Sequence, residues 1–194
     1  MKTHEEPLAA ESDQDSNVTD FLERIALEDP NQNLFSIQSE DGWKDLTAKQ
    51  FHEEVKAVAK GLIATGIKPG AGIGILSRTR YEWTLLDFAI WYAGAVSVPI
   101  YESSSPEQIK WVLGDSESVA CFFEKPEHLA SFESVQAALK NVKNTWVIEN
   151  GDLEQLKTAG TEISDEELED RRSAANLDTL ATIIYTSGTT GNPK

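Results

Sequence analysis

The sequence is poor in the residues that build disulfides and metal sites. Cys121 is the only cysteine, so no disulfide can form within the chain, and a reducing setting is expected. Cys121 lies in the apolar run S-V-A-C-F-F, which favours a core position over a nucleophilic one. The three histidines, His4, His52 and His128, have no cysteine or acidic motif partners. No metal site is predicted from them.

Long apolar segments and positive charge are also scarce. The longest apolar stretch, about 84–100, is interrupted by Asp87, Gly94, Ser97 and Pro99, so no transmembrane segment is predicted. The first residues lack the apolar core of a signal peptide. Lys and Arg number 17 against 33 Asp and Glu, which gives a net charge of -16 that opposes nucleic acid and anionic membranes. A cytoplasmic protein is expected, with peripheral contact at a membrane left open.

What remains is enough for one folded domain. The chain has 194 residues, of which 40% are hydrophobic, and this permits a sizeable core. Residues 1–16 carry five acids against Lys2 and little to bury. They are predicted to form a disordered acidic tail, and residues 17–194 are predicted to form the folded part.

The first half of the folded part predicts a helix, a β-hairpin and a longer helix. The first helix is expected over about 18–28, with three apolar residues on one face: Phe21, Leu22 and Ile25. Strands over 34–39 and 43–46 flank an Asp-Gly turn, which is typical of a hairpin. Thr47 and Gln50 form a T-x-x-Q capping box. Apolar residues at helical spacing follow it: Phe51, Val55, Val58, Leu62 and Ile63.

The second half alternates strands and helices. Strands are expected over 73–76, 96–100, 119–123, 146–149 and 182–185, and helices over about 80–92, 105–115, 126–139 and 165–174. Such alternation produces βαβ crossovers. The predicted fold class is therefore α/β, with a mostly parallel sheet and an N-terminal β-hairpin. Residues 149–178 hold ten acids and three bases, and apart from the short helix they are predicted to be a solvated excursion.

Tryptophans and arginines in this half receive ordinary structural roles. Trp83, Trp91 and Trp111 fall on helical faces and are predicted to be core residues. Arg78 and Arg80 follow a strand end, where they could meet an anion. Exposed positions at the start of a helix explain them equally well, so they are left out of the predicted site.

The last ten residues, Y-T-S-G-T-T-G-N-P-K, have the composition of a phosphate-binding loop. They follow an apolar run, 180–185, that predicts a buried strand, and ligands of parallel sheets bind beyond the carboxyl ends of strands. Gly188 and Gly191 let backbone N–H groups approach phosphate oxygens closely. Hydroxyls and one positive charge add further donors: Ser187, Thr189, Thr190 and Lys194. A plain Gly/Thr/Pro turn is the simpler alternative, and the G-x-x-x-x-G-K-[S/T] loop of kinases and GTPases is not present.

The string T-S-G-T-T-G-x-P-K resembles the phosphate-binding loop of the adenylate-forming (AMP-binding) superfamily. That superfamily includes acyl-CoA synthetases, luciferases and peptide-synthetase adenylation domains. Three further segments, G-I-L-S-R-T-R-Y-E-W, G-A-V-S-V-P-I-Y-E-S-S-S-P-E-Q-I and the D-S at Asp115-Ser116, are similar to bacterial long-chain fatty-acid–CoA ligases. The resemblance covers about 18–194 and implies an incomplete N-terminal part of an acyl-CoA synthetase-like fold.

The resemblance implies an ATP-dependent long-chain fatty-acid–CoA ligase. In such enzymes the fatty-acid carboxylate attacks the α-phosphorus of Mg-ATP, pyrophosphate leaves, and CoA displaces AMP from the acyl-adenylate. The implied substrate is a fatty acid, and the implied cofactors are ATP, Mg²⁺ and coenzyme A. The implied phosphate-binding residues are Thr186, Ser187, Gly188, Thr189, Thr190, Gly191 and Lys194. Thr186 is expected nearest the phosphates and magnesium, and Thr186 and Lys194 are the candidate catalytic residues.

In the family, the adenine motif, the magnesium-binding glutamate and the catalytic lysine all lie downstream of the position of Lys194. Residues 17–194 are therefore expected to be an N-terminal fragment of the AMP-binding domain that ends inside the loop. The fragment is expected to have no ligase activity alone and to have an uncovered apolar face through which it could self-associate. Two alternatives stay open: a non-catalytic α/β binding module with a vestigial loop, and another adenylating enzyme that activates aryl acids or amino acids.

Overall fold

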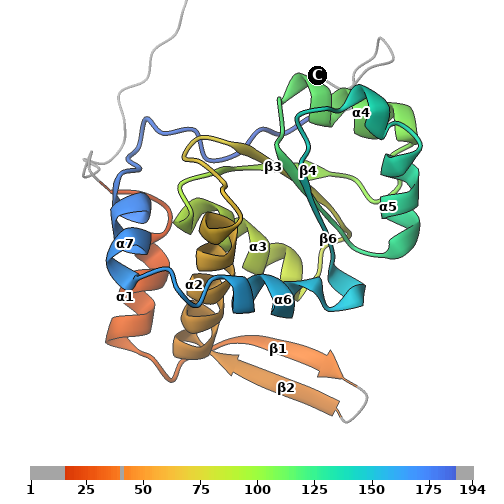
Figure 1. The fold of residues 1–194 in the computed structure, drawn as a ribbon. Helices are drawn as coiled ribbons and strands as arrows, with labels where there is room; N and C mark the ends of the chain where they lie inside the picture. The colour runs from red at the N-terminus through yellow and green to blue at the C-terminus, as the bar shows by residue number, and fades with distance from the viewer. Residues whose placement is uncertain (1–15, 40–41, 187–194) are drawn as a thin grey trace, which may run out of the picture.

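The computed structural model describes residues 16–39 and 42–186. The predicted tail (apart from Ser16), the tip of the predicted hairpin at 40–41 and loop residues 187–194 lie outside the described residues. The central element is a four-stranded parallel sheet in the order β4-β3-β5-β6 (Figure 1). Its strands are β3 (Gly72–Leu76), β4 (Val96–Ile100), β5 (Ala120–Phe123) and β6 (Asn144–Val147). The prediction of an α/β fold with a mostly parallel sheet is confirmed.

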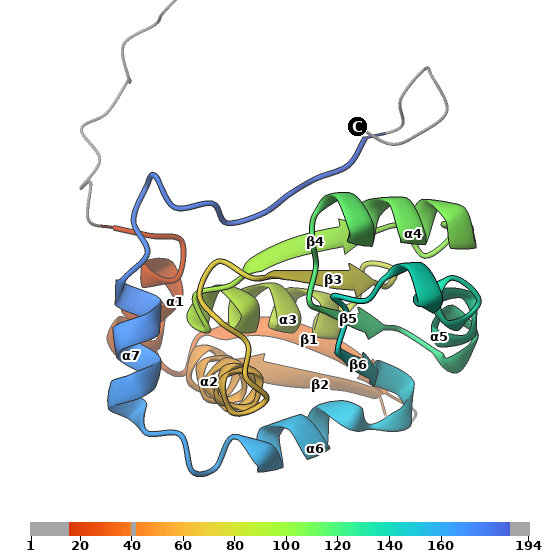
Figure 2. The ribbon, with the colours of Figure 1, turned by 45° about the horizontal axis from the view of Figure 1, so that its top comes forward.

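Helices cover both faces of this sheet (Figure 2). One face carries α2 (Ala48–Ala64), α3 (Tyr81–Tyr92) and α6 (Asp152–Ala159), and the other carries α4 (Pro106–Asp115) and α5 (Pro126–Glu133). Side chains alternate across a strand, so each strand feeds two cores. In β5, Phe122 packs with the α2 and α3 side, whereas Cys121 and Phe123 pack with the α4 and α5 side. Cys121 is fully buried, which confirms its predicted core position.

The N-terminal elements follow the sequence pattern closely. Helix α1 (Asp20–Glu28) precedes an antiparallel hairpin formed by β1 (Asn33–Ser39) and β2 (Gly42–Thr47). The capping box is present at the start of α2, where the Gln50 amide donates to Thr47 Oγ1 and the Thr47 amide donates to Gln50 Oε1. The predicted position of Phe21 is wrong, because its side chain is 63% exposed while Leu22 is buried. Adjacent helical residues point about 100° apart, and in α1 the buried face includes Leu22 and leaves Phe21 outside it.

The acidic region 149–178 is more ordered than predicted, although most of its residues are exposed. It forms α6, which the sequence did not predict, and α7 (Asp165–Ser173), which it did. Leu153, Leu156 and Leu168 from these helices are buried against the α2 side of the sheet. Two boundaries also differ from the prediction. The helix over 126–139 ends at Glu133 and is followed by a 3₁₀ turn, η1 (Gln136–Ala138), and strand β6 ends before another, η2 (Ile148–Asn150).

The predicted final strand over 182–185 does not form. A single parallel bridge joins Thr182 to Ser97 of β4, and Leu180 and Ile184 are exposed. The reason lies in β4, where the next parallel pairing would need an N–H from Pro99, and proline has none. Trp111 is likewise more exposed than its predicted core position, whereas Trp83 and Trp91 are half-buried. Within 16–39 and 42–186, no helix has the length and apolar character needed to cross a bilayer.

Candidate functional site

The candidate site lies at the carboxyl end of β4, where the chain segment 180–186 passes the edge of the sheet. Figure 2 shows this segment in blue along the β4 side. Thr186 is the one predicted site residue that the structure describes, and its side chain is exposed at this edge. The six others, Ser187, Gly188, Thr189, Thr190, Gly191 and Lys194, lie outside the described residues. Their grouping around a phosphate therefore stays a prediction.

Three hydrogen bonds attach segment 180–186 to Ser97. The Ser97 amide donates to the carbonyl oxygen of Ala181 at 3.0 Å, and the Ile183 amide donates to the carbonyl oxygen of Ser97 at 3.0 Å. The hydroxyl oxygens of Ser97 and Thr182 lie 2.9 Å apart. Trp91 of α3 adds a fourth bond, from its indole N–H to the carbonyl oxygen of Ala181, at 2.9 Å. These bonds hold the segment that leads directly to Thr186.

Tyr185 forms a second attachment, on the opposite face of the sheet. Its ring is buried with the α4 and α5 core, and its hydroxyl donates to Asp115 Oδ2 at 2.7 Å. Burial and the neighbouring Asp115 carboxylate raise the pKa of Tyr185 to about 12. Tyr185 is therefore a neutral hydrogen-bond donor at physiological pH. The strand-end aromatic residue serves as an anchor immediately before the first residue of the predicted site.

Two cavities flank Tyr185 at this edge. A cavity of about 80 Å³ is lined by Ile100, Ser104, Gln108, Tyr185 and Thr186, among others. A second cavity of about 250 Å³ has mainly apolar walls, which come from three parts of the chain: the β3–α3 turn with Ser77, Thr79 and Trp83, the residues after β4, and Ile184 with Tyr185. The two cavities thus meet at Tyr185, beside the residue that begins the predicted phosphate loop.

The two arginines that follow β3 are paired with acids, so they are not free to bind an anion. Arg78 Nε lies 2.8 Å from Glu124 Oε1, and the Arg78 amide donates to Glu124 Oε2 at 2.9 Å. Arg80 pairs with Glu82 at 2.6 Å, and weaker contacts reach Glu124 and Glu149. Glu124 is buried and was missed from sequence. A signal in the sequence could have identified Glu124. It directly follows the apolar strand A-C-F-F, and the neighbouring strand is followed by the basic segment S-R-T-R.

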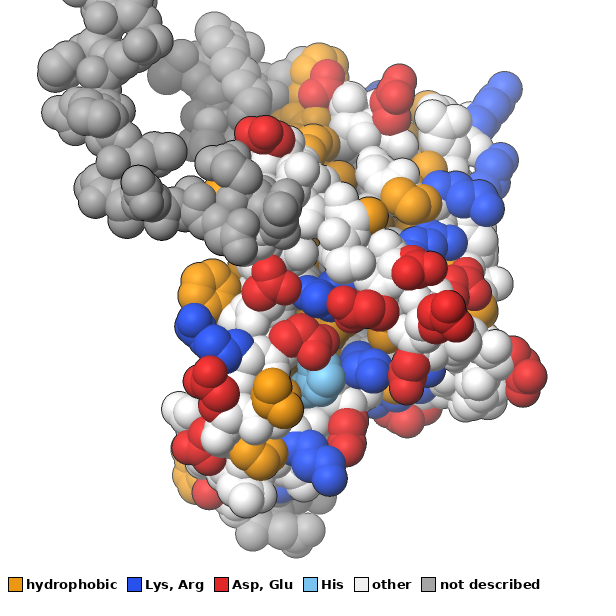
Figure 3. Space-filling view, turned by 90° about the vertical axis from the view of Figure 1, so that its left-hand side faces the viewer, with side chains coloured by type: hydrophobic (Ala, Val, Ile, Leu, Met, Phe, Trp, Pro, Cys, Tyr) orange, Lys and Arg blue, Asp and Glu red, His pale blue; other side chains and the backbone are white. Residues whose placement is uncertain are grey.

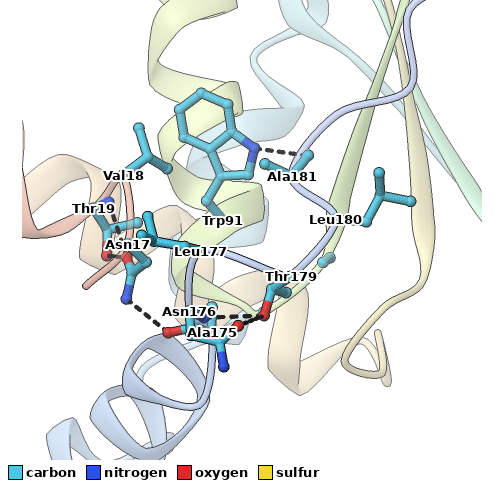
Figure 4. Close-up of a pocket in the computed structure, with 12 residues that line it drawn as sticks. Asn17, Val18, Thr19, Trp91, Ala175, Asn176, Leu177, Thr179, Leu180 and Ala181 are labelled. Carbon is cyan, nitrogen blue, oxygen red and sulfur yellow. Dashed lines mark hydrogen bonds between the residues drawn. The ribbon is translucent and has the colours of Figure 1, made fainter. Parts of the chain in front are cut away.

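A further cavity, of about 200 Å³, lies on the same edge of the sheet but at the other end of β4 (Figure 4). It is lined by residues that precede α1, by Trp91 at the end of α3, by Gly94 and Ala95 just before β4, and by residues 175–181. Ligands of parallel sheets bind at the carboxyl ends of the strands. This cavity is at the amino end of β4 and is separate from the candidate site.

The Tyr185 anchor gives a first testable prediction. Tyr185→Phe is expected to lower the free energy of unfolding by about 1 kcal/mol, because one side-chain hydrogen bond is lost while the ring still packs. The cost stays small because Asp115 is exposed and water can replace the lost donor. Urea unfolding at pH 7 measures it. Tyr101→Phe is the matched control, since Tyr101 is exposed, and it should leave stability unchanged. Equal effects of the two variants would contradict the anchor.

Residues 16–194 match the model of the AMP-binding enzyme family. The chain is 38% identical over 181 residues to a long-chain-fatty-acid–CoA ligase of Mycobacterium tuberculosis, covering 92% of this chain and 30% of the relative. A long-chain-fatty-acid–[acyl-carrier-protein] ligase of Arabidopsis thaliana is 30% identical over 203 residues, covering 92% of this chain and 26% of the relative. The chain thus spans about a third or less of these relatives.

Solved structures share the fold. The N-terminal domain of the protein FACL13 from Mycobacterium tuberculosis superposes with a TM-score of 0.74 at 22% identity, covering 89% of this chain and 42% of that one. A long-chain-fatty-acid-CoA ligase from Archaeoglobus fulgidus superposes with a TM-score of 0.73 at 20% identity, covering 91% of this chain and 35% of that one. At these identities the likeness concerns the fold alone.

Proposed function

The chain belongs to the AMP-binding enzyme family, and from this premise we propose that the protein takes part in the ATP-dependent activation of a long-chain fatty acid. The proposed reaction converts fatty acid, ATP and CoA into acyl-CoA, AMP and pyrophosphate through an acyl-adenylate. The 38% identity with a fatty-acid–CoA ligase supports this choice of substrate class. The observation that carries the proposal is the attachment of 181–183 to β4, because it brings Thr186 to the ligand-binding edge of a parallel sheet.

The proposed residues act by binding and orienting the polyphosphate. Attack of a carboxylate on ATP brings two anions together, so donors that hold and neutralise the β- and γ-phosphates lower the barrier. We assign this role to Thr186, Ser187, Gly188, Thr189, Thr190, Gly191 and Lys194. Thr186 follows the anchored Tyr185 directly, so its hydroxyl starts from a defined position. Lys194 contributes a positive charge in a chain whose net charge is -16.

We propose that the magnesium ion arrives with the nucleotide. Within 16–39 and 42–186, no group of three or more His, Cys, Asp or Glu side chains is arranged to hold a metal. Mg²⁺ bound to ATP usually relies on phosphate oxygens, waters and one or two protein ligands, and needs no such cage. The Thr186 hydroxyl is the proposed protein ligand. The ion would neutralise phosphate charge, while the loop residues orient the phosphates.

Substrate-dependent ATP–pyrophosphate exchange tests the proposed function. The polypeptide to test contains this chain and has the full length of its relatives. When palmitate is supplied, it is expected to exchange labelled pyrophosphate into ATP. Benzoate and a mixture of amino acids are the comparison substrates for the two other adenylating chemistries. Exchange with amino acids or benzoate alone would overturn the fatty-acid assignment. No exchange with any acid would favour the non-catalytic α/β module.

The 194-residue chain by itself has a separate expected result. It holds the predicted phosphate loop but not the adenine motif, the magnesium-binding glutamate or the catalytic lysine that the resemblance implies, so we expect no ligase activity and weak binding of Mg-ATP. Equilibrium dialysis should give a dissociation constant in the millimolar range or above, on the order of a 4 kcal/mol binding free energy. Micromolar binding would contradict this division of the site.

A further inference from the structure

Glu124 is a buried carboxylate that the proposed phosphate site does not use. It follows β5 in the interior of the sheet, and it is 4% exposed. Its backbone is held on both sides: the Glu124 amide donates to the carbonyl oxygen of Leu76 at 2.9 Å, and the Glu149 amide donates to the carbonyl oxygen of Glu124 at 3.0 Å. The side chain therefore starts from a fixed point. A charge in such a place is costly unless it is paired and hydrogen-bonded.

The Glu124 side chain reaches the turn 77–80, which joins β3 to α3. Its Oε2 atom accepts a hydrogen bond from the Arg78 amide at 2.9 Å and lies 3.4 Å from the Ser77 hydroxyl oxygen. Its Oε1 atom lies 2.8 Å from Arg78 Nε, but the Arg78 side chain is 65% exposed, so water screens this ion pair. The bond from the backbone amide to a buried carboxylate is the stronger tie, and it acts on the shape of the turn itself.

The turn forms part of the cavity of about 250 Å³ that lies beside Tyr185. Ser77 and Thr79 line this cavity, and so does Trp83 from the first turn of α3. Tyr185 also lines the smaller cavity together with Thr186, the first residue of the predicted phosphate loop. A change in the shape of the turn would therefore alter the space next to the place where the phosphates are expected.

The walls of the larger cavity suit an uncharged chain. Much of the lining is apolar, with contributions from Trp83, Ile100 and Ile184, and the charged residue in the lining is the acid Glu102. Glu102 would repel phosphate groups. The proposed reaction supplies two molecules with an uncharged, flexible chain: the fatty acid, and CoA with the arm that carries its thiol. ATP has no such chain.

We propose that Glu124 is a positioning residue: by accepting a hydrogen bond from the Arg78 amide, it fixes the turn 77–80 as one wall of a cavity for the uncharged chain of a substrate. Its importance for catalysis rests on the function proposed above, whereas the tie between Glu124 and the turn does not. Glu124 acts through the turn and not on the reacting atoms, so its loss should change substrate binding more than the chemical step.

Amide hydrogen exchange on the 194-residue chain tests the tie. Glu124→Leu removes the acceptor and is expected to reduce protection of the Arg78 amide about 10- to 100-fold, the effect of losing a hydrogen bond to a charged group. Glu124→Gln keeps an acceptor without the charge, so it should lose about 5-fold or less. Glu124→Asp, whose shorter side chain withdraws the acceptor, replaces Glu124→Leu if that variant does not fold. The Lys143 amide, which donates to the carbonyl oxygen of Val119 at the other end of β5, is the internal control.

Arg78→Met is the matched control variant, because it removes the ion pair and leaves the backbone bond in place. It should change protection at position 78 by less than about 3-fold. Unchanged protection at position 78 in Glu124→Leu would overturn the proposal. An equal loss at position 78 and at Lys143 would also overturn it, because that pattern indicates general destabilisation. So would a loss in Arg78→Met as large as in Glu124→Leu, since the ion pair would then be the tie.

Assays of the polypeptide with the full length of the relatives separate this proposal from the proposed function. ATP–pyrophosphate exchange gives the KM for palmitate and for ATP, and acyl-CoA formation gives the KM for CoA. Glu124→Leu is expected to raise the KM for palmitate or for CoA about 5- to 10-fold with kcat within about 2-fold, and the substrate affected identifies the chain in the cavity. Glu124→Gln should restore that KM.

The outcomes of these assays are distinct. A raised KM for ATP alone, or normal KM values for all three substrates in Glu124→Leu, would reject the positioning role. Absence of exchange in every protein, with the amide pattern as expected, would reject the ligase function and leave the tie between Glu124 and the turn standing.

Discussion

Gly61→Ala is expected to lower the free energy of unfolding by about 2–3 kcal/mol, although alanine is the better helix former. Gly61 lies inside α2, where alanine alone would gain about 1 kcal/mol. A Cβ at this position would lie 2.2 Å from the carbonyl oxygen of Leu156 in α6. Backbone atoms cannot rotate away as a side-chain end can, so the two helices must separate. Overpacking of this kind costs about 1–3 kcal/mol, and more where the backbone must move.

Gly160, which directly follows α6, should behave in the same way as Gly61. A Cβ on Gly160 would lie 2.4 Å from the Gly61 nitrogen and 2.6 Å from the Lys60 carbonyl carbon. Because either methyl group forces the same separation of α2 from α6, the double variant should lose less stability than the sum of the two single variants. Strict additivity would contradict a shared contact.

Gly114→Ala is the matched control for this pair. Gly114 is also helical, in α4, and its Cβ would meet only Leu139 Cδ2 at an ordinary 3.6 Å. This variant should gain about 0.5–1 kcal/mol from helix propensity. Urea unfolding followed by circular dichroism measures all three single variants. A neutral or stabilising Gly61→Ala would show that α6 does not pack against α2 as closely as described.

Arg172→Met is the second large expected effect, a loss of about 2 kcal/mol at pH 7. The guanidinium of Arg172 is 10% exposed and joins α7 to α1. It bonds to Asp20 at 2.5 Å, to the Thr19 hydroxyl at 2.9 Å and to both oxygens of Glu169. Breaking a buried ion pair costs about 3–5 kcal/mol. The acids here are partly exposed, so water replaces part of what they lose and the expected cost is lower.

Figure 3 shows acidic and basic side chains mixed over the face that α1 and α7 form. Arg24, an exposed arginine on α1, provides the control for Arg172→Met. Arg24→Met removes a charge that lies over the Phe21 ring at 5.4 Å, and it should change stability by less than about 0.5 kcal/mol. Thermal and urea unfolding measure both variants. Equal effects of Arg172→Met and Arg24→Met would contradict the tie between the two helices.

The pH dependence of stability should follow from two carboxyl groups shifted in opposite directions. Hydrogen bonding to His52 is the main cause that lowers the pKa of Glu23 to about 2. Its contribution is present above about pH 4.5 and is lost as the pH falls toward 2. Burial raises the pKa of Asp87 to about 6, so its carboxylate destabilises the fold progressively as the pH rises from about 4 to 6. Maximal stability is expected at about pH 4–4.5, and Asp87→Asn should remove the decline above it.

Local chemistry made much of the fold predictable. The capping box at Thr47 hydrogen-bonds as its spacing predicts. The apolar face of α2, the Asp-Gly hairpin signal and the alternation of strands and helices identified the elements and the parallel sheet. These features depend on residues close together in sequence, and neighbouring elements pair in space when crossovers are short. The family resemblance was carried by short contiguous segments for the same reason.

The errors arose where distant residues decide. Helix α6 was missed because its acids suggested solvent exposure, whereas its burial depends on the fit of Gly160 against Gly61. The final strand failed because Pro99, far upstream, cannot donate the next hydrogen bond. Glu124 and Arg172 look like ordinary surface charges in sequence, and only the fold gives them their partners. Of the residues that the sequence predicts for the phosphate site, Thr186 alone lies within the described part of the chain, so the site stays a prediction.

The sequence by itself determined the fold class and the family, and it predicts a phosphate-binding loop after Tyr185. Each of these follows from periodicity, capping residues or a contiguous motif, which are properties of neighbouring residues. Only the tertiary structure decided how the segment 181–185 before that loop is held: by Ser97 and Trp91 on one face of the sheet, and by Asp115 on the other. The physical reason is that a buried hydroxyl or carboxyl group must find its partner wherever the fold places one, and that partner can lie anywhere in the chain.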